Sequence, residues 1–458
     1  MRRFAFMLFA GVPSVLAAQG FAVSEHNTCT MGRAGAAAAS PCADGSAIYF
    51  SPAGLAGLAG KHLTFGSTFI AASGSFTDEF TLQQTKLDNP LIKVPAGYAT
   101  YAVNPKLTVG IGAYAPYGLE TKWPVAGFAG RFLGYNTKIH SIYIQPTAGY
   151  QVNSWLKVGI GWAYITSKLE LHQRVDFSSQ VVPSASVPPG TTFRALGIPT
   201  GTDFADANLS ATGNGYAVNF GAIVKVNDRL SIGGHWLTRK TINYDGDARF
   251  TQIPTGLVLP LGHKFQLPPL CDTLTPCNVD NLAATAFIPG GALTNGKAHT
   301  TITLPPQGSI GFAYRVQDNW TLMADYQTII WGWFATVKIH FDNPATPDII
   351  LVPHNNDSHA VRLGTEYRRS DKLTLRAGYL YHTSASPPDF VTPLLPENDR
   401  NEFTGGASYR ISPRVVGEVA YQYIKQNDRR GEVLPAAGNT GVYTFHAHLF
   451  GAGVALTF

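Results

Sequence analysis

Stretches in which apolar and polar residues alternate recur from Lys61 to the end of the chain. A period of two is typical of β-strands that face an apolar environment on one side and a polar one on the other. The pattern predicts fourteen strands. They begin near His62, Ala96, Leu107, Thr137, Leu156, Gly215, Leu230, Thr300, Trp320, Ser358, Leu373, Asn401, Val415 and Gly441.

Six short phrases between these strands share one pattern. In each, a bulky residue ends one strand, two or three turn-forming residues follow, and a new alternating stretch begins. They occupy residues 101–107, 150–156, 224–230, 314–320, 367–373 and 409–415. The intervening connections are long, so tight turns alternate with long loops. This is typical of transmembrane barrels, which have short periplasmic turns and long extracellular loops. We therefore predict an all-β fold, a 14-stranded antiparallel transmembrane β-barrel over residues 61–458.

Composition agrees with a membrane barrel. Of 458 residues, 45% are hydrophobic and only 14% are charged, and the mean hydropathy is near zero. A soluble protein usually carries about 25% charged residues. The net charge of +5 is mild, and the chain has no Lys/Arg run of the kind that binds nucleic acid.

The N-terminus predicts export. Arg2 and Arg3 precede an apolar run over residues 4–16, and Ala17 and Ala18 follow it. We predict a signal peptide over residues 1–18; an N-terminal membrane anchor is the alternative. At the other end, Phe458 closes an alternating strand, which is typical of outer-membrane proteins recognised by the barrel insertion machinery. The sequence thus predicts the outer membrane of a Gram-negative cell.

Residues 19–60 do not alternate and are rich in small residues and turn formers. Irregular backbone at membrane depth must be buried in protein or line a cavity. We expect this segment to form a plug, or hatch, inside the barrel.

The four cysteines fall into two local pairs, Cys29 with Cys42 and Cys271 with Cys277. In an oxidising compartment both pairs are expected to form disulfides. A zinc site is the alternative, but the spacings are wide and no histidine pattern accompanies them, so no metal or cofactor is predicted.

Strand parity predicts what lies inside and outside the barrel. The tyrosines of the turn phrases should face lipid as an aromatic belt; these are Tyr101, Tyr150, Tyr314, Tyr367 and Tyr409. On the last strand Phe445 and Leu449 should point inward. An apolar lumenal patch is expected where the cargo is apolar, but these side chains could equally pack against the plug.

The plug carries a resemblance to a known family. Gly32, Arg33, Ser51, Pro52 and Ala53 stand within stretches that resemble the N-terminal hatch of the FadL family, outer-membrane transporters of long-chain fatty acids and other hydrophobic compounds. Residues 116–123 and 304–305 follow in the family's order. Ser51 replaces the family's usual asparagine, and its short polar side chain should preserve the turn.

The resemblance implies a hydrophobic groove among the external loops, a lumenal pocket beside the mature N-terminus, and a lateral gap at an inward kink of the third strand. Phe21 would lie near the pocket, or would pack the plug. Release sideways into lipid retains about 0.8 kcal/mol per buried methylene. Pro116 could break the strand ladder or merely end the strand, in which case the kink would lie near Gly110 and Gly112, just above Tyr101.

The sequence is compatible with three classes of function. Passive uptake of hydrophobic molecules, long-chain fatty acids or aromatic hydrocarbons, by a monomer in contact with outer-membrane lipid is the first hypothesis. Arg362 and Arg376 could pair with a carboxylate or form salt bridges with Glu366 and Glu418. A general diffusion porin is the second hypothesis, and adhesion or phage reception through the loops a third. No catalytic constellation is evident, so no enzyme is predicted.

Overall fold

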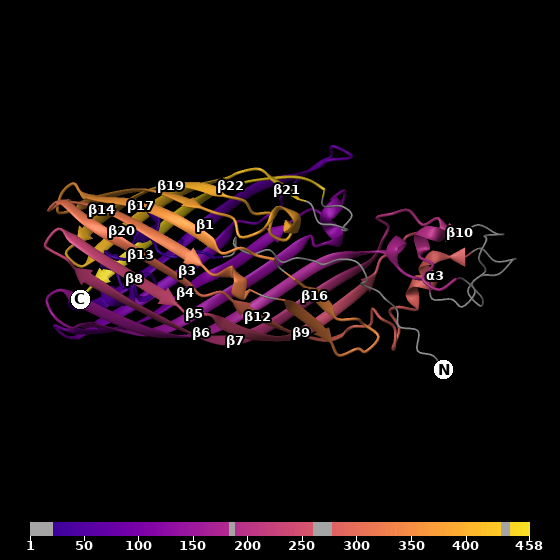
Figure 1. Cartoon of the computed structure of the whole chain (residues 1–458), viewed down its shortest axis with the longest axis horizontal. Coiled ribbons are helices and arrows are strands. Elements are labelled where there is room, and N and C mark those ends of the chain that lie inside the picture. The colour runs from indigo at the N-terminus through magenta and orange to yellow at the C-terminus, as the bar shows by residue number, and fades with distance from the viewer. Residues whose placement is uncertain (1–21, 183–187, 260–276, 335, 353, 432–439) are drawn as a thin grey trace.

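The computed structural model describes residues 22–182, 188–259, 277–334, 336–352, 354–431 and 440–458. Their strands close into a 14-stranded antiparallel barrel (Figure 1), which confirms the predicted fold class. The predicted signal peptide lies outside the described residues.

The barrel spans follow one another around the wall in chain order. They are β1 (Lys61–Asp78), β3 (Ile92–Asn104), β4 (Leu107–Lys122), β5 (Asn136–Gln151), β6 (Leu156–Asp176), β7 (Asp203–Lys225), β8 (Leu230–Leu237) with β9 (Lys240–Gln252), β12 (Gly296–Leu304) with β13 (Gln307–Gln317), β14 (Trp320–Ile329) with β15 (Val337–Phe341), β17 (Ser358–Arg368), β18 (Leu373–His382), β19 (Arg400–Ser412), β20 (Val415–Gln426) and β22 (Gly441–Thr457).

The first and last spans close the barrel. β1 pairs with β22 from His62 opposite Thr457 to Asp78 opposite Gly441. The six turn phrases join β3 to β4, β5 to β6, β7 to β8, β13 to β14, β17 to β18 and β19 to β20, all at one end. Most spans begin within a few residues of the predicted position, but β7 begins at Asp203 rather than near Gly215. The additional residues, 203–214, extend the strand away from the tight turns and pair with β6 on one side and β9 on the other.

Three of the spans consist of two strands each, and the interruptions change the side-chain parity. Pro305 and Pro306 separate β12 from β13, as expected of residues that cannot donate to a ladder. Between β8 and β9 the alternation shifts, so Lys240 is buried. Its Nζ donates to the Tyr117 hydroxyl at 2.8 Å and to the carbonyl of Pro305 at 2.7 Å. The preceding Arg239 lies over the ring of exposed Trp333, 4.3 Å from its centroid.

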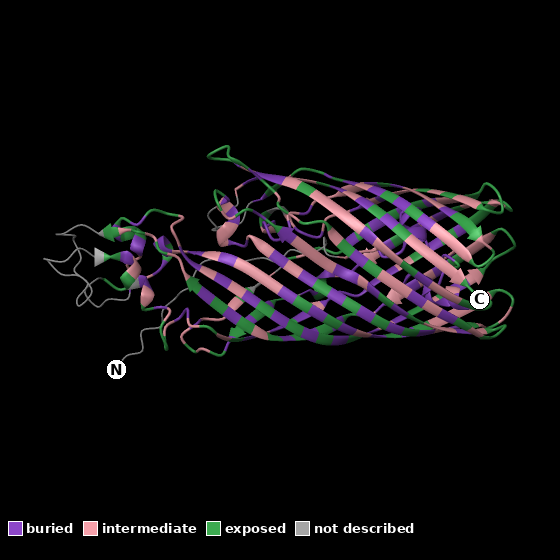
Figure 2. Ribbon diagram, turned by 180° about the vertical axis from the view of Figure 1, so that it is seen from behind, coloured by how far each residue is buried: buried purple, intermediate pink, exposed green. Residues whose placement is uncertain are grey.

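Buried and exposed residues alternate along the wall, as Figure 2 shows. All five belt tyrosines are exposed, from 37% for Tyr367 to 52% for Tyr409. Their outward orientation was predicted and is confirmed. The strands therefore present apolar and aromatic side chains on the outer surface of the barrel, and the lumen contains the hatch.

The hatch begins, in the described residues, at Ala22 and contains three short helices. They are α1 (Thr28–Met31), α2 (Ala47–Phe50) and the 3-10 turn η1 (Pro52–Leu55). The hatch bonds to inward side chains of several strands. Gln145 of β5 donates to the carbonyl of Ile48 at 2.6 Å, and Asp325 of β14 accepts from the backbone N–H groups of Ala37 and Ala38 at 2.7 and 2.9 Å. The plug is thus held within the lumen.

The connections at the far end of the barrel carry the remaining elements. These are β2 (Gln84–Lys86), η2 (Ala129–Phe132), η3 (Phe177–Ser179), η4 (Phe193–Leu196), β10 (Val258–Leu259), β11 (Cys277–Asn278), α3 (Val279–Ala284), η5 (Trp331–Trp333), β16 (Ile349–Leu351), η6 (Pro388–Phe390) and β21 (Arg429–Gly431). None of the helices in the described ranges has the length and apolar character to cross a membrane.

Candidate functional site: a lumenal cavity beside an open strand ladder

A cavity of about 140 Å³ lies beside the first described residues of the hatch. Ala22, Val23 and Glu25 form its hatch side. Its wall comes from neighbouring strands of the closed barrel, β20, β22, β1, β3 and β4, together with the loop before β19. Its apolar lining consists mainly of Ile70, Ala72, Leu87, Ile92, Leu119, Trp123, Leu395, Ile424, Phe445, Ala447 and Leu449.

The apolar patch expected on the last strand is part of this cavity. Phe445 and Leu449 both line it, and Leu449 is 1% exposed. Because β22 pairs with β1, the patch continues across the seam to Ile70 and Ala72. Phe21 lies outside the described residues, and its predicted place near the pocket stays a prediction.

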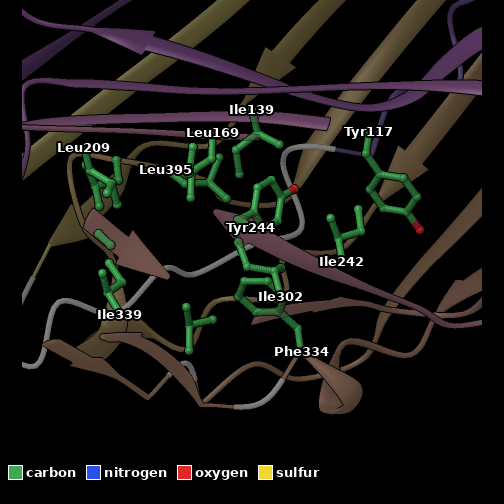
Figure 3. Close-up of a cluster of buried hydrophobic side chains, with 14 of the residues drawn as sticks. Tyr117, Ile139, Leu169, Leu209, Ile242, Tyr244, Ile302, Phe334, Ile339 and Leu395 are labelled. Carbon is green, nitrogen blue, oxygen red and sulfur yellow. The ribbon is translucent and has the colours of Figure 1, made fainter. Parts of the chain in front are cut away.

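The opposite side of the lumen is filled rather than hollow. Figure 3 shows apolar side chains from β5, β6, β7, β9, β12 and β15 pointing toward one another, including Ile139, Leu169, Ile242, Ile302 and Ile339. All five are 5% exposed or less. These side chains form a packed apolar core, whereas the cavity lies on the side of β1, β3 and β4.

Neither of the two arginines that could have paired with a carboxylate lines this cavity. Arg362 holds the hatch, and Arg376 pairs with glutamates of the wall. Arg362 donates to the carbonyl of Ala34 at 3.0 Å and to the Ser24 hydroxyl at 3.1 Å. Arg376 contacts Glu366 at 2.7 Å, and Glu418 lies 3.9 Å away. Salt bridging to these two glutamates was the alternative reading of Arg376, and the geometry agrees with it.

Two charged side chains that line the cavity, Arg400 and Glu397, were not predicted from the sequence. Arg400 lies 2.7 Å from Glu402, close enough for an ion pair although the two groups are not aligned as a hydrogen bond. Glu397 accepts from the backbone N–H groups of Ala385 and Ser386 at 2.9 and 3.0 Å, while its burial raises the pKa of the carboxyl. Both lie at or near the long loop before β19, whose folding no local pattern predicts. The cation of the cavity is therefore already paired.

Beside the cavity, the ladder between β3 and β4 is open. The two strands pair from Asn104 opposite Leu107 up to Gly97 opposite Ala113 and no further. β3 continues to pair with β1 as far as Ile92, and β4 continues to Lys122 along β5. The wall thus contains a stretch in which neighbouring strands run without hydrogen bonds between them.

The opening is closed again at its outer end. The side chain of Asn89 donates to the carbonyl of Glu120 at 2.6 Å and accepts from the backbone N–H of Lys122 at 2.7 Å. The backbone N–H of Asp88 donates to the carbonyl of Lys122 at 2.8 Å. We call the bounded stretch between residues 90–96 and 114–119 the window. Ile92, Gly118 and Leu119 border both the window and the cavity.

The position of the interruption corrects two expectations. Gly110 and Gly112 lie in continuous ladders, opposite Thr100 and Tyr98 on β3, so the lateral gap expected at these glycines is not there. Pro116 does not end the strand either. Instead, β4 has one extra residue between Tyr114 and Tyr117, a bulge against β5 that contains Pro116. A bulge re-aims the side chains around it, which explains why both tyrosines are buried.

The hatch touches the free edge of β4 directly. The backbone N–H of Val23 donates to the carbonyl of Pro116 at 2.9 Å, and Ala22 forms an isolated bridge with Tyr117. The N-terminal segment of the hatch therefore occupies part of the edge that β3 leaves unpaired.

Close packing explains the hatch motif. A side chain on Gly32 would meet the Cα of Gly406 at 3.1 Å. Arg33 is buried, donates to the carbonyl of Ser40 at 2.6 Å and lies 3.7 Å from Glu366. The Ser51 hydroxyl donates to the carbonyl of Ala38 at 3.0 Å, which fits the expectation that serine preserves this turn.

The following turn packs against the wall. A side chain on Gly159 of β6 would meet the backbone of Pro52 at 2.2 Å and that of Ala53 at 2.4 Å. The close approach of hatch and strand requires glycine at that wall position.

Cys29 and Cys42 form a disulfide, which confirms the first predicted pair. Cys271 and the side chain of Cys277 lie outside what the structure describes. Among the described residues, one group has the geometry of metal ligands, namely Cys29, Cys42 and Asp44. The disulfide consumes both sulfurs, so this group does not constitute a metal site.

An aromatic group surrounds His26 between the hatch and β3–β4. The His26 Nδ1 lies 2.8 Å from the Tyr98 hydroxyl, and the rings of Tyr49 and Tyr114 lie 4.4 and 5.1 Å from its ring. Burial lowers the pKa of His26 to about 3, so the ring is neutral near pH 7. A neutral imidazole suits these aromatic surroundings.

Comparison with known proteins identifies the family. A family model described as "Outer membrane protein transport protein (OMPP1/FadL/TodX)" matches residues 9–458. The chain belongs to this family. It is therefore an outer-membrane β-barrel transporter of hydrophobic substrates, a membrane channel and not an enzyme.

Relatives in the FadL/TodX family match along nearly the whole chain. The "47 kDa outer membrane protein" of Pasteurella multocida is 25% identical over 98% of this chain and 96% of its own length. The "Long-chain fatty acid transport protein" of Escherichia coli O157:H7 is 22% identical over 96% of this chain and 94% of its own.

Solved structures of the FadL/TodX family share the fold. A Pseudomonas aeruginosa FadL homologue superposes with a TM-score of 0.79 at 17% identity, covering 96% of this chain and all of its own. The Ralstonia pickettii toluene transporter TbuX gives a TM-score of 0.65 at 16% identity, covering 94% and 98%. At these identities the likeness concerns the fold alone.

Proposed function

We propose that this protein takes up hydrophobic molecules passively, by capture among the outer loops, transfer into the lumenal cavity and sideways release through the window between β3 and β4. The observation that carries the proposal is the open ladder between β3 and β4. Ile92, Gly118 and Leu119 line the cavity and also form the edges of the window, so the two adjoin. An apolar guest that leaves sideways stays out of water, which retains about 0.8 kcal/mol per methylene.

Long-chain fatty acids are the first cargo class, because several relatives that match over most of their length are long-chain fatty acid transport proteins. Aromatic hydrocarbons are the second, and two observations favour them. The cavity volume of about 140 Å³ is close to the roughly 150 Å³ that accommodates a benzene ring. In addition, Arg400 is already paired with Glu402, so a carboxylate would have to compete for it.

Gly118 allows a direct test of the window. A Cβ at this position would meet its nearest neighbours at 3.7 and 3.8 Å, which is ordinary contact. Gly118→Trp should therefore fold and place an indole between the cavity and the opening. Gly296→Trp is a matched control, because Gly296 has its nearest neighbour at 4.0 Å and lies at the start of β12, away from the cavity.

Cells that produce each protein would be given labelled oleate and labelled toluene. We expect Gly118→Trp to lower uptake at least about tenfold relative to wild type, and Gly296→Trp to leave it unchanged. Full uptake by a folded Gly118→Trp protein would exclude the window as the exit. Large steady currents of the wild type in planar bilayers would instead support a general diffusion porin.

A further inference from the structure

A second cavity, of about 400 Å³, lies at the end of the lumen where the tight turns are. Residues 39–41 of the hatch and Gly54 form its roof, and the turns β5–β6 and β7–β8 contribute Ser154, Trp155 and Asn227 to its rim. By the orientation inferred from the turns, this is the periplasmic mouth of the barrel. We call it the mouth cavity.

The charges of the mouth cavity are unbalanced. Four cations line it, Lys157, Lys225, Arg229 and Arg315, and one carboxylate, that of Asp228. Asp228 pairs with Lys225 at 2.7 Å and its side chain is 93% exposed. Lys157, Arg229 and Arg315 form no salt bridge with any residue that the structure describes. Three positive charges thus remain without a partner.

Deeper in the lumen the buried cations have partners. Glu366 pairs with Arg33 and Arg376, and Glu402 with Arg400, while Lys240 and Arg362 donate hydrogen bonds to carbonyl and hydroxyl oxygens. Holding uncompensated like charges together costs stability. A cluster of unpaired cations inside a concave, partly enclosed site favours an anion that supplies the missing charge.

Several features indicate the source of this anion. Lys157, Lys225 and Arg315 occupy inward positions of their strands. The exposed Ile160, Phe220 and Tyr314 lie an odd number of positions away from them on the same strands and so point to the opposite face. The barrel wall therefore separates the cations from phospholipids in the surrounding leaflet. The lining offers only a few apolar side chains, chiefly Trp155 and Ile223, so it provides no trough for an acyl chain. The anion must be soluble and must enter from the periplasm.

We propose that the mouth cavity is a docking site for an acidic segment of a periplasmic protein. A volume of about 400 Å³ admits a few residues of extended chain. Trp155, 51% exposed at the rim, supplies a large rigid contact surface of the kind found at protein interfaces. This inference goes beyond the uptake function and does not depend on which hydrophobic cargo is carried.

The roof links a docked segment to the hatch. Ser40 and Pro41 adjoin Cys42 of the disulfide, and the carbonyl of Ser40 accepts from Arg33. A bound acidic chain would therefore contact a part of the hatch that is covalently stapled to α1.

The test uses the purified full-length protein in detergent and a fluorescein-labelled peptide of six glutamates. Fluorescence anisotropy should show saturable binding that weakens as salt is raised, and a peptide of six glutamines should not bind. The double variant Lys157→Gln/Arg315→Gln should weaken binding at least about tenfold, because it removes two of the cations without a partner.

The matched control is Lys372→Gln/Arg414→Gln. It removes two exposed cations from turns at the same end of the barrel that do not line the mouth cavity, and it should bind the peptide like wild type. If both double variants lost peptide binding equally, binding would depend only on the overall positive charge of this end of the barrel. That result would overturn the proposal. Displacement of the peptide by decanoate at equimolar amounts, or by phosphatidylglycerol vesicles, would reassign the site to an amphiphile or a lipid. No binding by a folded wild type would also overturn it.

Discussion

The backbone N–H of Val23 donates to the carbonyl oxygen of Pro116 across 2.9 Å. This bond joins the start of the described hatch to the edge of β4 that β3 leaves unpaired, beside the cavity. The hatch and the barrel wall are therefore connected by a backbone hydrogen bond, and a displacement of one should alter the position of the other.

Removing this donor should release the N-terminal segment. Val23→Pro deletes the N–H, whereas Val23→Ala keeps it and removes only side-chain atoms. We expect faster hydrogen exchange in residues 22–28 of the proline variant, by about fivefold or more, corresponding to about 1 kcal/mol for the lost bond. Exchange of the barrel strands should be unchanged. Identical exchange in both variants would show that the bond does not hold the segment.

Gly35 should not tolerate a side chain. Its φ is +73°, and a Cβ would lie 2.0 Å from Nη1 of Arg362, which holds the carbonyl of Ala34. Gly35→Ala should destabilise the hatch by about 1–3 kcal/mol, from the left-handed backbone and the displaced guanidinium together. Limited proteolysis of the hatch measures this. Gly405→Ala, whose nearest neighbour lies at 4.0 Å, is the control and should resist proteolysis like wild type.

The disulfide between Cys29 and Cys42 should stabilise the hatch locally. It closes a loop with a sequence separation of 13 residues, for which chain entropy predicts about 3 kcal/mol. Cys29→Ser/Cys42→Ser should therefore raise hydrogen exchange over residues 28–44 while the barrel remains folded. Reductant should have the same effect on the wild type and none on the variant. Unchanged protection in the reduced wild type would contradict the prediction.

The hatch should become less stable as the pH is lowered, because His26 must then take up a proton. An unfolded histidine takes up a proton near pH 6.5, whereas burial keeps the pKa of His26 at about 3. Protonation thus favours the open hatch, so the stabilisation is present above pH 6.5 and is lost as the pH falls toward 3, by about 2 kcal/mol at pH 5. The pH dependence of hatch hydrogen exchange in wild type, compared with His26→Asn, isolates this contribution. Parallel curves would exclude His26 as its source.

The spans could be predicted because the period of two and the turn phrases are local signals. The lipid-facing tyrosines and the inward Phe445 and Leu449 followed from parity alone. Parity fails where the register changes, so Lys240 and the bulge around Pro116 were not foreseen.

The polar part of the site was hidden for another reason. Arg400 and Glu397 reach the cavity through the folding of a long loop, and Arg362 is diverted by hatch carbonyls more than 300 residues away in sequence. Such contacts depend on tertiary packing and leave no periodic trace. The charge surplus of the mouth cavity, in contrast, was present in the turn phrases but could be located only once the hatch was placed.

The seam between β1 and β22 has a consequence for the order of assembly. Lys61, where the hatch becomes strand, exchanges backbone hydrogen bonds with Phe458 at 3.1 and 2.9 Å. Side chains on Gly451 and Gly453 of the last strand would meet Thr28 of the hatch at 3.5 and 3.0 Å. The plug is thus in contact with the strand that closes the barrel. The closing pair of strands and the plug therefore share contacts, so closure of the barrel and docking of the hatch are expected to be coupled steps of assembly.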